Sequence, residues 1–159
     1  MSETKPKIVK WDMHLPYRWS AGIVGTRWLE ELKNGRIMGT RCPKCKRVLV
    51  PARKFCPRCF VDTTEWVQVG DKGTLRTYTI VNFNFTDQVK NPPYIVGIID
   101  LDGADVSFTH FIGEVDLSNI EKASKELRLG MRVQAVWKPP EKREGNIFDI
   151  EYFKPIKEE

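Results

Sequence analysis

No stretch of this 159-residue sequence approaches the ~20 consecutive apolar residues of a membrane-spanning helix. Its first residues, MSETKPKIVKW, lack the apolar core of a secretory signal peptide. The two histidines, His14 and His110, have no cysteine, serine or carboxylate at a spacing typical of a catalytic pair, and no nucleophile motif accompanies them. We therefore predict a cytoplasmic protein without membrane contacts, in which both histidines pack structurally and no residue is catalytic.

Cysteine is absent outside one segment, where four cysteines form two C-x-x-C pairs separated by ten residues: Cys42, Cys45, Cys56 and Cys59. In a reducing cytoplasm such pairs bind metal rather than form disulfides, although a cluster of reduced thiols is the less specific alternative. Two such knuckles direct four thiolates to one point, as tetrahedral zinc requires, and leave no open position for catalysis. We predict structural zinc, with iron as the minor alternative because ligand type does not exclude it.

Acidic residues are missing from the same segment. Residues 36–58 contain eight lysines and arginines and no aspartate or glutamate, which leaves 18 basic against 21 acidic residues in the rest of the chain. The net charge of +5 is therefore concentrated around the cysteines. Such a patch is either a solvated face that keeps the protein soluble or a surface that meets an anionic partner.

The N-terminal part, residues 1–35, is predicted to be an arm followed by one helix. Residues 11–19, WDMHLPYRW, hold three aromatic side chains and are expected to pack on the body of the protein or on a partner. A helix is expected from Ser20, its N-cap, to a stop at Lys33-Asn34-Gly35. Its apolar stripe consists of Ile23, Val24, Trp28, Leu29 and Leu32.

The rest of the sequence is typical of β structure. Around the knuckles, residues 36–69, short strands are expected at 37–40, 48–50 and 65–69. Residues 70–159 predict five strands, with a helix at 118–127 between the third and the fourth; the strands fall near 74–83, 94–101, 106–113, 131–138 and 147–155. In the last strand, Phe148, Ile150 and Tyr152 are expected to share one face. This order is that of an OB-fold barrel, so the fold class is mainly β with an N-terminal helix, a zinc ribbon and a five-stranded OB-fold.

Taken together, these elements resemble a family of acyl-CoA-associated proteins that accompany thiolases, built from a rubredoxin-like zinc ribbon and an OB-fold. The resemblance covers roughly residues 17–155. Several short motifs carry it in this order: the C-x-x-C pairs with Val50-Pro51-x-Arg53 between them, Gly73-Thr74, Thr77-Tyr78-Thr79, Pro93-Tyr94-Ile95-Val96, Leu129-Gly130-Met131-x-Val133 and Phe153-Lys154-Pro155. Three features depart from the family pattern: Lys46 replaces a glycine that eases a left-handed turn, residues 106–111 are rich in aromatic side chains, and the polar loop 141–146 has no counterpart.

The resemblance implies a non-catalytic subunit that bridges a thiolase to a second acyl-CoA enzyme, such as hydroxymethylglutaryl-CoA synthase or a hydratase, and helps hold the CoA-linked intermediate. In that setting Arg53 is the best candidate for a bidentate contact with CoA phosphates. Asn82, Phe83, Phe85 and Tyr94 are candidates to contact the acyl-pantetheine arm or adenine, with barrel packing as the alternative for the aromatic side chains.

The rival interpretation is a nucleic-acid-binding protein, because zinc ribbons and OB barrels both commonly hold single strands. The basic ribbon fits it. The acidic balance of the remainder and the few cations in the first two barrel strands weigh against it. We therefore expect no nucleic-acid partner.

Overall fold

The computed structural model describes residues 7–9, 17–85 and 88–156. The predictions for most of the N-terminal arm, for residues 11–16 and for His14 lie outside these residues. Tyr17 and Trp19 are described, and their side chains are 80% and 73% exposed, so these two do not pack on the body of the protein, and the alternative contact with a partner stays a prediction. No helix among the described residues is long and apolar enough to cross a membrane.

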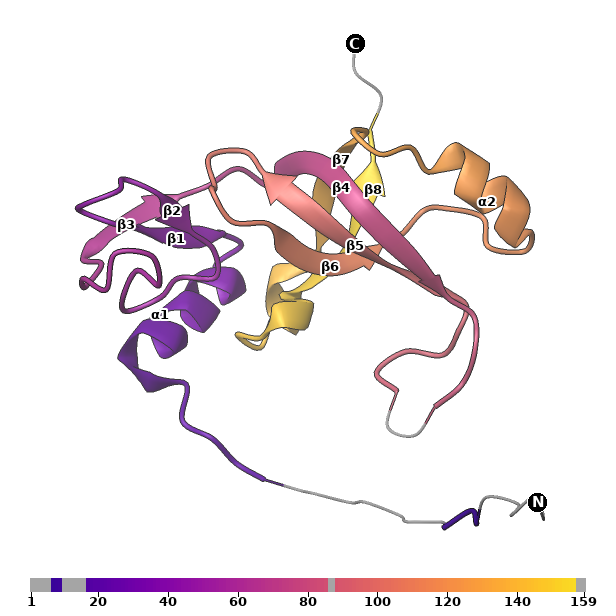
Figure 1. Cartoon of the computed structure of the whole chain (residues 1–159), viewed down its shortest axis with the longest axis horizontal. Coiled ribbons are helices and arrows are strands. Elements are labelled where there is room, and N and C mark those ends of the chain that lie inside the picture. The colour runs from indigo at the N-terminus through magenta and orange to yellow at the C-terminus, as the bar shows by residue number, and fades with distance from the viewer. Residues whose placement is uncertain (1–6, 10–16, 86–87, 157–159) are drawn as a thin grey trace, which may run out of the picture.

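Helix α1 (Gly22–Lys33) packs beside the ribbon, as Figure 1 shows. Its predicted stripe is confirmed at Trp28 and Leu32, which are buried, while Ile23 is 92% exposed because its turn extends beyond the sheet. The guanidinium of Arg27 lies 4.2 Å from the ring centroid of Trp66 and adds a cation–π contact between helix and ribbon.

The two ends of α1 differ in how well the sequence specifies them. Ala21, not Ser20, occupies the N-cap and makes no side-chain hydrogen bond there, so that prediction is wrong. The hydroxyl of Ser20 accepts only from the N–H of Gly22, at 3.3 Å. The stop is confirmed: Gly35 has φ +73° and donates its N–H to the carbonyl of Leu32 at 2.8 Å.

The ribbon is a three-stranded antiparallel sheet of β1 (Met38–Arg41), β2 (Val48–Leu49) and β3 (Glu65–Gln68) in the order β2-β1-β3. These strands confirm the three predicted positions, and every strand end agrees with its prediction to within one residue. The first cysteine pair lies between β1 and β2, and the second lies between β2 and β3.

The second part is a closed five-stranded barrel, which confirms the OB-fold. Its strands are β4 (Lys72–Val81), β5 (Tyr94–Leu101), β6 (Phe108–Ile112), β7 (Arg132–Trp137) and β8 (Ile150–Pro155), joined in the order β4-β5-β6-β8-β7. The barrel closes where β7 returns to β4 and where β6 meets β8 in parallel at Ile112 and Phe153. Helix α2 (Ile120–Glu126) lies between β6 and β7 as predicted, with the side chain of Asn119 as N-cap.

One predicted face in the last strand is wrong. Ile147–Asp149 form a 3-10 turn (η2) before β8, and Phe148 is 40% exposed, whereas Ile150 and Phe153 are fully buried. The register between β7 and β8 shifts because Tyr152 pairs with Val136 while Ile150 pairs with Trp137, which leaves Glu151 as an extra residue. This bulge lets residues three apart both face the core.

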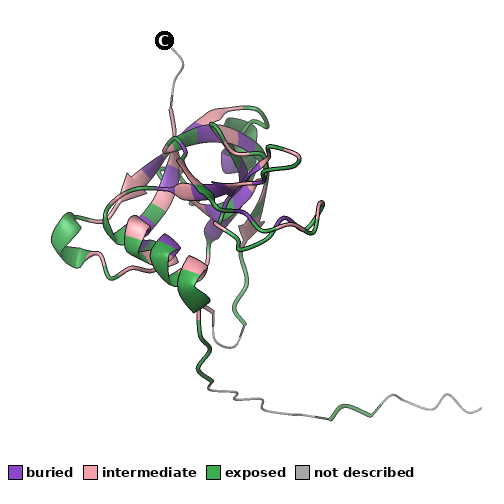
Figure 2. Cartoon of the chain, turned by 90° about the vertical axis from the view of Figure 1, so that its left-hand side faces the viewer, coloured by how far each residue is buried: buried purple, intermediate pink, exposed green. Residues whose placement is uncertain are grey.

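Ribbon, helix and barrel share one apolar core. Trp28 and Leu32 of α1, Val48 and Val50 of the ribbon, and the barrel interior belong to a single buried cluster. Figure 2 shows these buried segments gathered in the strands, with the first turn of α1 exposed.

Asp105, in the loop between β5 and β6, joins the barrel to the edge of the ribbon. Its carboxylate accepts the N–H of Val48 at 2.8 Å, and its own N–H donates to the carbonyl of Val48 at 2.9 Å. The guanidinium of Arg47 donates to the carbonyl of Asp105 at 2.7 Å. The tip of this hairpin therefore fixes how ribbon and barrel are oriented.

Candidate metal centre and neighbouring surfaces

Two knuckles of the same geometry hold the four cysteines. In the first, the N–H of Lys46 donates to the carbonyl of Cys42 at 2.9 Å, and in the second the N–H of Phe60 donates to the carbonyl of Cys56 at the same distance. Cys42 and Cys56 are fully buried, while the second cysteine of each pair is half-buried. The knuckles therefore face each other across a shielded centre.

The four Sγ atoms lie within 4.8 Å of one another. Cys45 Sγ and Cys56 Sγ are 3.8 Å apart. A tetrahedral zinc ion with Zn–S bonds of about 2.3 Å separates its sulfur ligands by about 3.8 Å, so the cluster fits such an ion with small adjustments. These four residues fit a metal site by geometry and by donor chemistry.

The thiols of this cluster have divergent proton affinities. Burial opposes ionisation of Cys42, but N–H donation from Cys45 and Lys44 outweighs it and lowers the pKa of Cys42 to about 6. Burial and the neighbouring sulfur atoms raise the pKa of Cys59 to about 12. Four thiolates this close repel one another, so full ionisation needs a bound cation.

The positive patch around the centre divides into paired and free cations. Arg36 pairs with Glu31, Arg41 pairs with Glu65, and Arg47 binds the loop of Asp105. Five others are exposed and, within the part of the chain that the structure describes, their side chains make no ion pair: Lys44, Lys46, Arg53, Lys54 and Arg58. Their charge is available to an anionic partner.

Arg53 lies at the surface between the two knuckles, and its backbone is held by two buried threonines. The hydroxyl of Thr40 accepts the N–H of Arg53 at 3.0 Å and donates to its carbonyl at 2.9 Å. Thr63 donates its hydroxyl to the same carbonyl. The exposed side chain of Arg53 therefore starts from a fixed point.

The other four predicted acyl-CoA residues lie at the loop between β4 and β5, on the other side of the barrel from the ribbon (Figure 1). Phe83 and Phe85 are exposed, and their ring centroids are 6.0 Å apart. Tyr94 is buried, and its hydroxyl accepts from the side-chain amide of Gln88 at 3.1 Å. Asn82 is exposed at the end of β4. The side chain of Gln88 links the three by hydrogen bonds to the carbonyl of Phe83, the N–H of Phe85 and the hydroxyl of Tyr94, whereas Arg53 lies apart from them in the ribbon.

His110 is buried in the barrel, where its ring stacks on Phe108 with centroids 5.8 Å apart. Its Nε2 lies 3.1 Å from the carbonyl oxygen of Ile147, and Nδ1 has no hydrogen-bond partner among the described residues. Burial lowers the pKa of His110 below its usual value. The prediction of a packing role for His110 agrees with this environment.

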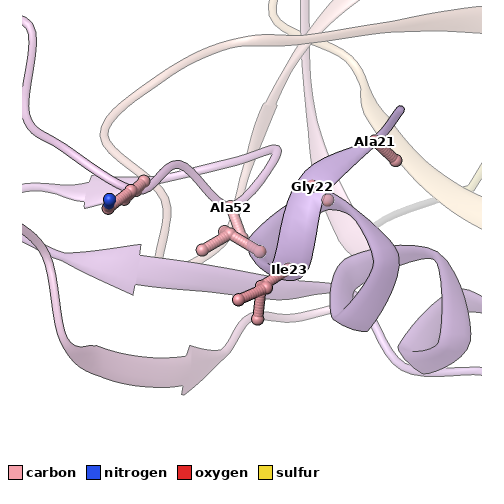
Figure 3. A pocket seen from close by; sticks show the side chains of 7 residues that line it. Ala21, Gly22, Ile23 and Ala52 are labelled. Atoms are coloured by element: carbon pink, nitrogen blue, oxygen red, sulfur yellow. The ribbon is translucent and has the colours of Figure 1, made fainter. Parts of the chain in front are cut away.

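A groove of about 580 Å³ opens beside the ribbon, between the first turns of α1 and the segment after Pro51. Figure 3 shows Ile23 and Ala52 on its walls, and Lys54 also lines it. The sequence does not indicate this groove, because helical periodicity predicts Ile23 on the buried stripe of the helix.

A second groove lies on the barrel. It has a volume of about 440 Å³ and is lined by residues that include Phe111 of β6, Phe148 of η2 and the lysines Lys90 and Lys138. Residues 106–111 are rich in aromatic side chains, but nothing in the sequence pairs Phe111 with Phe148, so the sequence does not predict this groove.

Comparison with known proteins gives the same two-part architecture. Residues 29–65 match the family model "ChsH2, rubredoxin-like zinc ribbon domain", and residues 66–138 match "ChsH2, C-terminal OB-fold domain". A solved structure of an Ltp2-ChsH2(DUF35) aldolase is similar in fold, with a TM-score of 0.62, 20% identity, and coverage of 87% of this chain and 98% of that one.

Two proteins of methanogens are similar in sequence. A DUF35 domain-containing scaffold protein of Methanothermobacter thermautotrophicus is 32% identical over 97 residues, which are 59% of this chain and 71% of that protein. A DUF35 domain-containing scaffold protein of Methanocaldococcus jannaschii is 30% identical over 149 residues, which are 91% of this chain and 99% of that protein. The resemblance inferred from the motifs is confirmed, and the chain belongs to the family of DUF35 domain-containing scaffold proteins, with a zinc ribbon and a C-terminal OB-fold domain.

Proposed function

We propose that this protein is a cytoplasmic, non-catalytic scaffold subunit that bridges a thiolase to a second acyl-CoA enzyme, such as hydroxymethylglutaryl-CoA synthase, and helps hold the CoA-linked intermediate. One surface carries this proposal, and we call it the helix–ribbon face. It is defined by two groups of exposed residues: Trp19 and Ile23 around the start of α1, and Lys54, Phe55, Arg58 and Phe60 before and in the second knuckle. Ile23 of the first group and Lys54 of the second line the same groove, and an exposed apolar groove with a charged rim is typical of protein–protein contact sites.

The charge of this face specifies its partner. Lys54 and Arg58 make no ion pair among the described residues, and the groove beside Lys54 is otherwise lined by apolar or small side chains. A complementary partner therefore presents an apolar ridge flanked by carboxylates. The relatives named as scaffold proteins and the neighbour solved as an aldolase complex support a partner among acyl-CoA enzymes.

The metal has a structural role in this proposal. Cys42, Cys45, Cys56 and Cys59 bind one zinc ion, which leaves no open coordination position and holds both knuckle tips in place. Since Phe60 and Arg58 belong to the second knuckle, the ion keeps the helix–ribbon face in shape. Iron fits the same ligands, and the metal content of the purified protein distinguishes the two.

For the acyl-CoA itself, the proposed contacts fall into two groups. Arg53 is positioned by Thr40 and Thr63 to contact a phosphate near the knuckles. Asn82, Phe83, Phe85 and Tyr94 offer amide and aromatic contacts at the loop after β4. Each group is testable by itself through substitution in the assembled complex.

Co-expression tests the scaffold role. The chain is expected to co-elute in size-exclusion chromatography with a thiolase of its own genome, and the synthase is expected to join that peak. Separate peaks for all three proteins would show that the proposal is wrong. The double charge reversal Lys54→Glu with Arg58→Glu is expected to weaken the complex at least about tenfold, because like charges then face the partner.

A matched variant controls for net charge. Lys125 and Lys142 are exposed on α2 and in the loop after β7, outside the helix–ribbon face. Their double reversal to glutamate changes the net charge by the same amount. If this control variant binds the partner and the Lys54→Glu, Arg58→Glu variant does not, the interface lies on the helix–ribbon face. Equal loss of binding in both variants would indicate a nonspecific charge effect.

A further inference from the structure

The outer wall of the barrel carries a groove whose lining residues belong neither to the helix–ribbon face nor to the proposed acyl-CoA contacts. It is formed where residues 89–90 of the loop between β4 and β5, strand β6 and the segment from the end of β7 to β8 come together, and it is lined by Lys90, Phe111, Lys138, Phe148, Glu151 and Tyr152. In a five-stranded OB barrel, the face of the second and third strands and these two loops form the usual ligand-binding surface. The groove therefore lies where this fold most often binds a ligand.

Two aromatic rings form the apolar part of the groove. Phe111 and Phe148 have ring centroids 6.3 Å apart and planes inclined by only 15°. Phe148 is 40% exposed, and a smaller hollow of about 150 Å³ borders the same two rings. Nearly parallel, partly exposed rings offer a flat surface on which a planar aromatic group can stack.

The polar part of the groove consists of two lysines and one carboxylate. Lys90 Nζ lies 5.3 Å from the ring centroid of Phe111, so its charge is held beside the stacking surface. Neither Lys90 nor Lys138 makes an ion pair among the described residues. Two ammonium groups suit one phosphate, and the carboxylate of Glu151 can accept a hydrogen bond from an exocyclic amino group.

The loop that contributes Lys138 and Phe148 is held rigid by a buried acid. The carboxylate of Asp149 is fully buried and accepts the N–H groups of Glu144, Gly145 and Asn146 at 3.0, 2.7 and 3.1 Å. The carbonyl of Asp149 accepts the N–H of Lys138 at 2.9 Å. Both groove residues on this loop are therefore preorganised, which reduces the entropy lost when a ligand binds.

From these contacts we infer that the barrel groove is a binding site for a mononucleotide, with its base on Phe111 and Phe148 and its phosphate facing Lys90 and Lys138. The volume of about 440 Å³ suits one such ligand and not a strand. A single strand requires a row of cations along its backbone, whereas here two lysines share the groove with Glu151. This inference does not rest on the scaffold role, because none of the groove residues belongs to the helix–ribbon face; the groove adjoins the proposed acyl-CoA contacts at Tyr94, which packs on Phe111 with ring centroids 5.6 Å apart.

Calorimetric titration of the full-length, metal-loaded protein tests it. Adenosine 5′-monophosphate is expected to bind at one site per chain, and adenosine and inorganic phosphate are each expected to bind more weakly. Phe148→Ala is expected to weaken binding roughly tenfold, as loss of one stacking partner does. Lys90→Gln and Lys138→Gln are expected to weaken binding of the monophosphate while leaving that of adenosine unchanged.

Matched variants outside the groove serve as controls. Tyr17→Ala removes an exposed aromatic side chain ahead of α1, and Lys125→Gln removes an exposed lysine from α2. Both are expected to bind like the unmodified protein. Thermal unfolding of every variant verifies its fold, and the Lys90→Gln and Lys138→Gln variants provide a test should Phe148→Ala fail to fold.

Three results would overturn the inference: no binding at nucleotide concentrations of about 1 mM, equal binding by groove and control variants, or much tighter binding of a single-stranded oligonucleotide with affinity that rises with length. Coenzyme A distinguishes the sources of the nucleotide. Equal affinity for coenzyme A and the monophosphate would support the nucleotide end of CoA as ligand, and weaker binding of coenzyme A would support a free nucleotide.

Discussion

Lys46 and Phe60 occupy equivalent positions in the two knuckles, each four residues after the first cysteine of its pair, and both have a left-handed backbone, with φ values of +63° and +52°. That conformation costs a residue with a Cβ roughly 1–2 kcal/mol. Lys46 keeps the left-handed turn although the family pattern has a glycine there, and the second knuckle repeats this conformation at Phe60. The side chains of both residues are exposed on the ribbon, and Phe60 belongs to the helix–ribbon face.

Replacing Lys46 by glycine is therefore expected to stabilise the protein. Glycine tolerates the left-handed conformation, although it also adds entropy to the unfolded chain, so we expect the unfolding free energy to rise by about 0.5–1 kcal/mol. Urea denaturation of the metal-loaded protein measures this change. Lys44→Gly is the matched control, because Lys44 is exposed in the same knuckle without a positive φ, and it is expected to lose stability. A loss of stability in Lys46→Gly would contradict the assignment of strain.

Loss of the Asp105 side chain is expected to loosen the ribbon on the barrel. In Asp105→Ala the N–H of Val48, a buried residue, loses its acceptor, at a cost of about 1–3 kcal/mol. Hydrogen exchange measured by NMR is expected to show faster exchange of the Val48 amide. Asp105→Asn retains a side-chain oxygen and is expected to protect this amide nearly as well as the original residue. Unchanged exchange in Asp105→Ala would mean that another contact holds the ribbon.

Much of this architecture can be predicted because its signals are local. The spacing of the cysteines predicts the cluster of four thiols, and Gly35 ends α1 where the sequence indicates. The order of strands and the helix at 120–126 follow from runs of β-branched residues and their breaks. In each case the residues that determine the feature are close together in the chain.

The features that the sequence did not predict depend on long-range register. The extra residue Glu151 in β8 moves Tyr152 out of the expected face, and the 3-10 turn η2 places Phe148 beside Phe111, which is 37 positions earlier in the chain. Asp105 binds Val48 across 57 positions of the chain. No periodicity within either segment reports such contacts, because they arise only when the barrel closes.

Acid is expected to weaken the fold through His110. Burial lowers the pKa of this imidazole in the folded protein below about 6.5, its value in an unfolded chain. As the pH falls below that value, the unfolded chain takes up a proton that the folded protein does not, so the unfolding free energy decreases by up to about 1.4 kcal/mol per pH unit until the folded pKa is reached. The stabilisation is complete above pH ~6.5.

Denaturation curves between pH ~5 and ~8, where carboxylates stay ionised, measure this slope. His110→Phe keeps a stacked ring but does not titrate, and it is expected to show a shallower dependence. His14 is present in both proteins, so its contribution cancels in the comparison. Identical slopes would show that the proton affinity of His110 does not change on folding.

Removal of the metal is expected to have the largest effect. Ribbon residues such as Ile37, Val48 and Val50 belong to the same core as the barrel, so loss of the knuckles exposes apolar surface beyond the ribbon itself. We expect one zinc ion per chain by elemental analysis. A chelator is expected to lower the unfolding free energy by at least about 4 kcal/mol, the linkage expected for a ligand at a thousand times its dissociation constant.

Cys56→Ser tests whether this effect belongs to the cysteine cluster. Because Cys56 is fully buried and its Sγ lies 3.8 Å from that of Cys45, the variant is expected to lose the metal and to respond no further to the chelator. Equal stability with and without metal would contradict a structural ion. Visible absorption from a ferric thiolate centre would assign iron, since d¹⁰ zinc is colourless. The same chelated protein is expected to lose its thiolase complex, because Arg58 and Phe60 depend on the second knuckle for their positions.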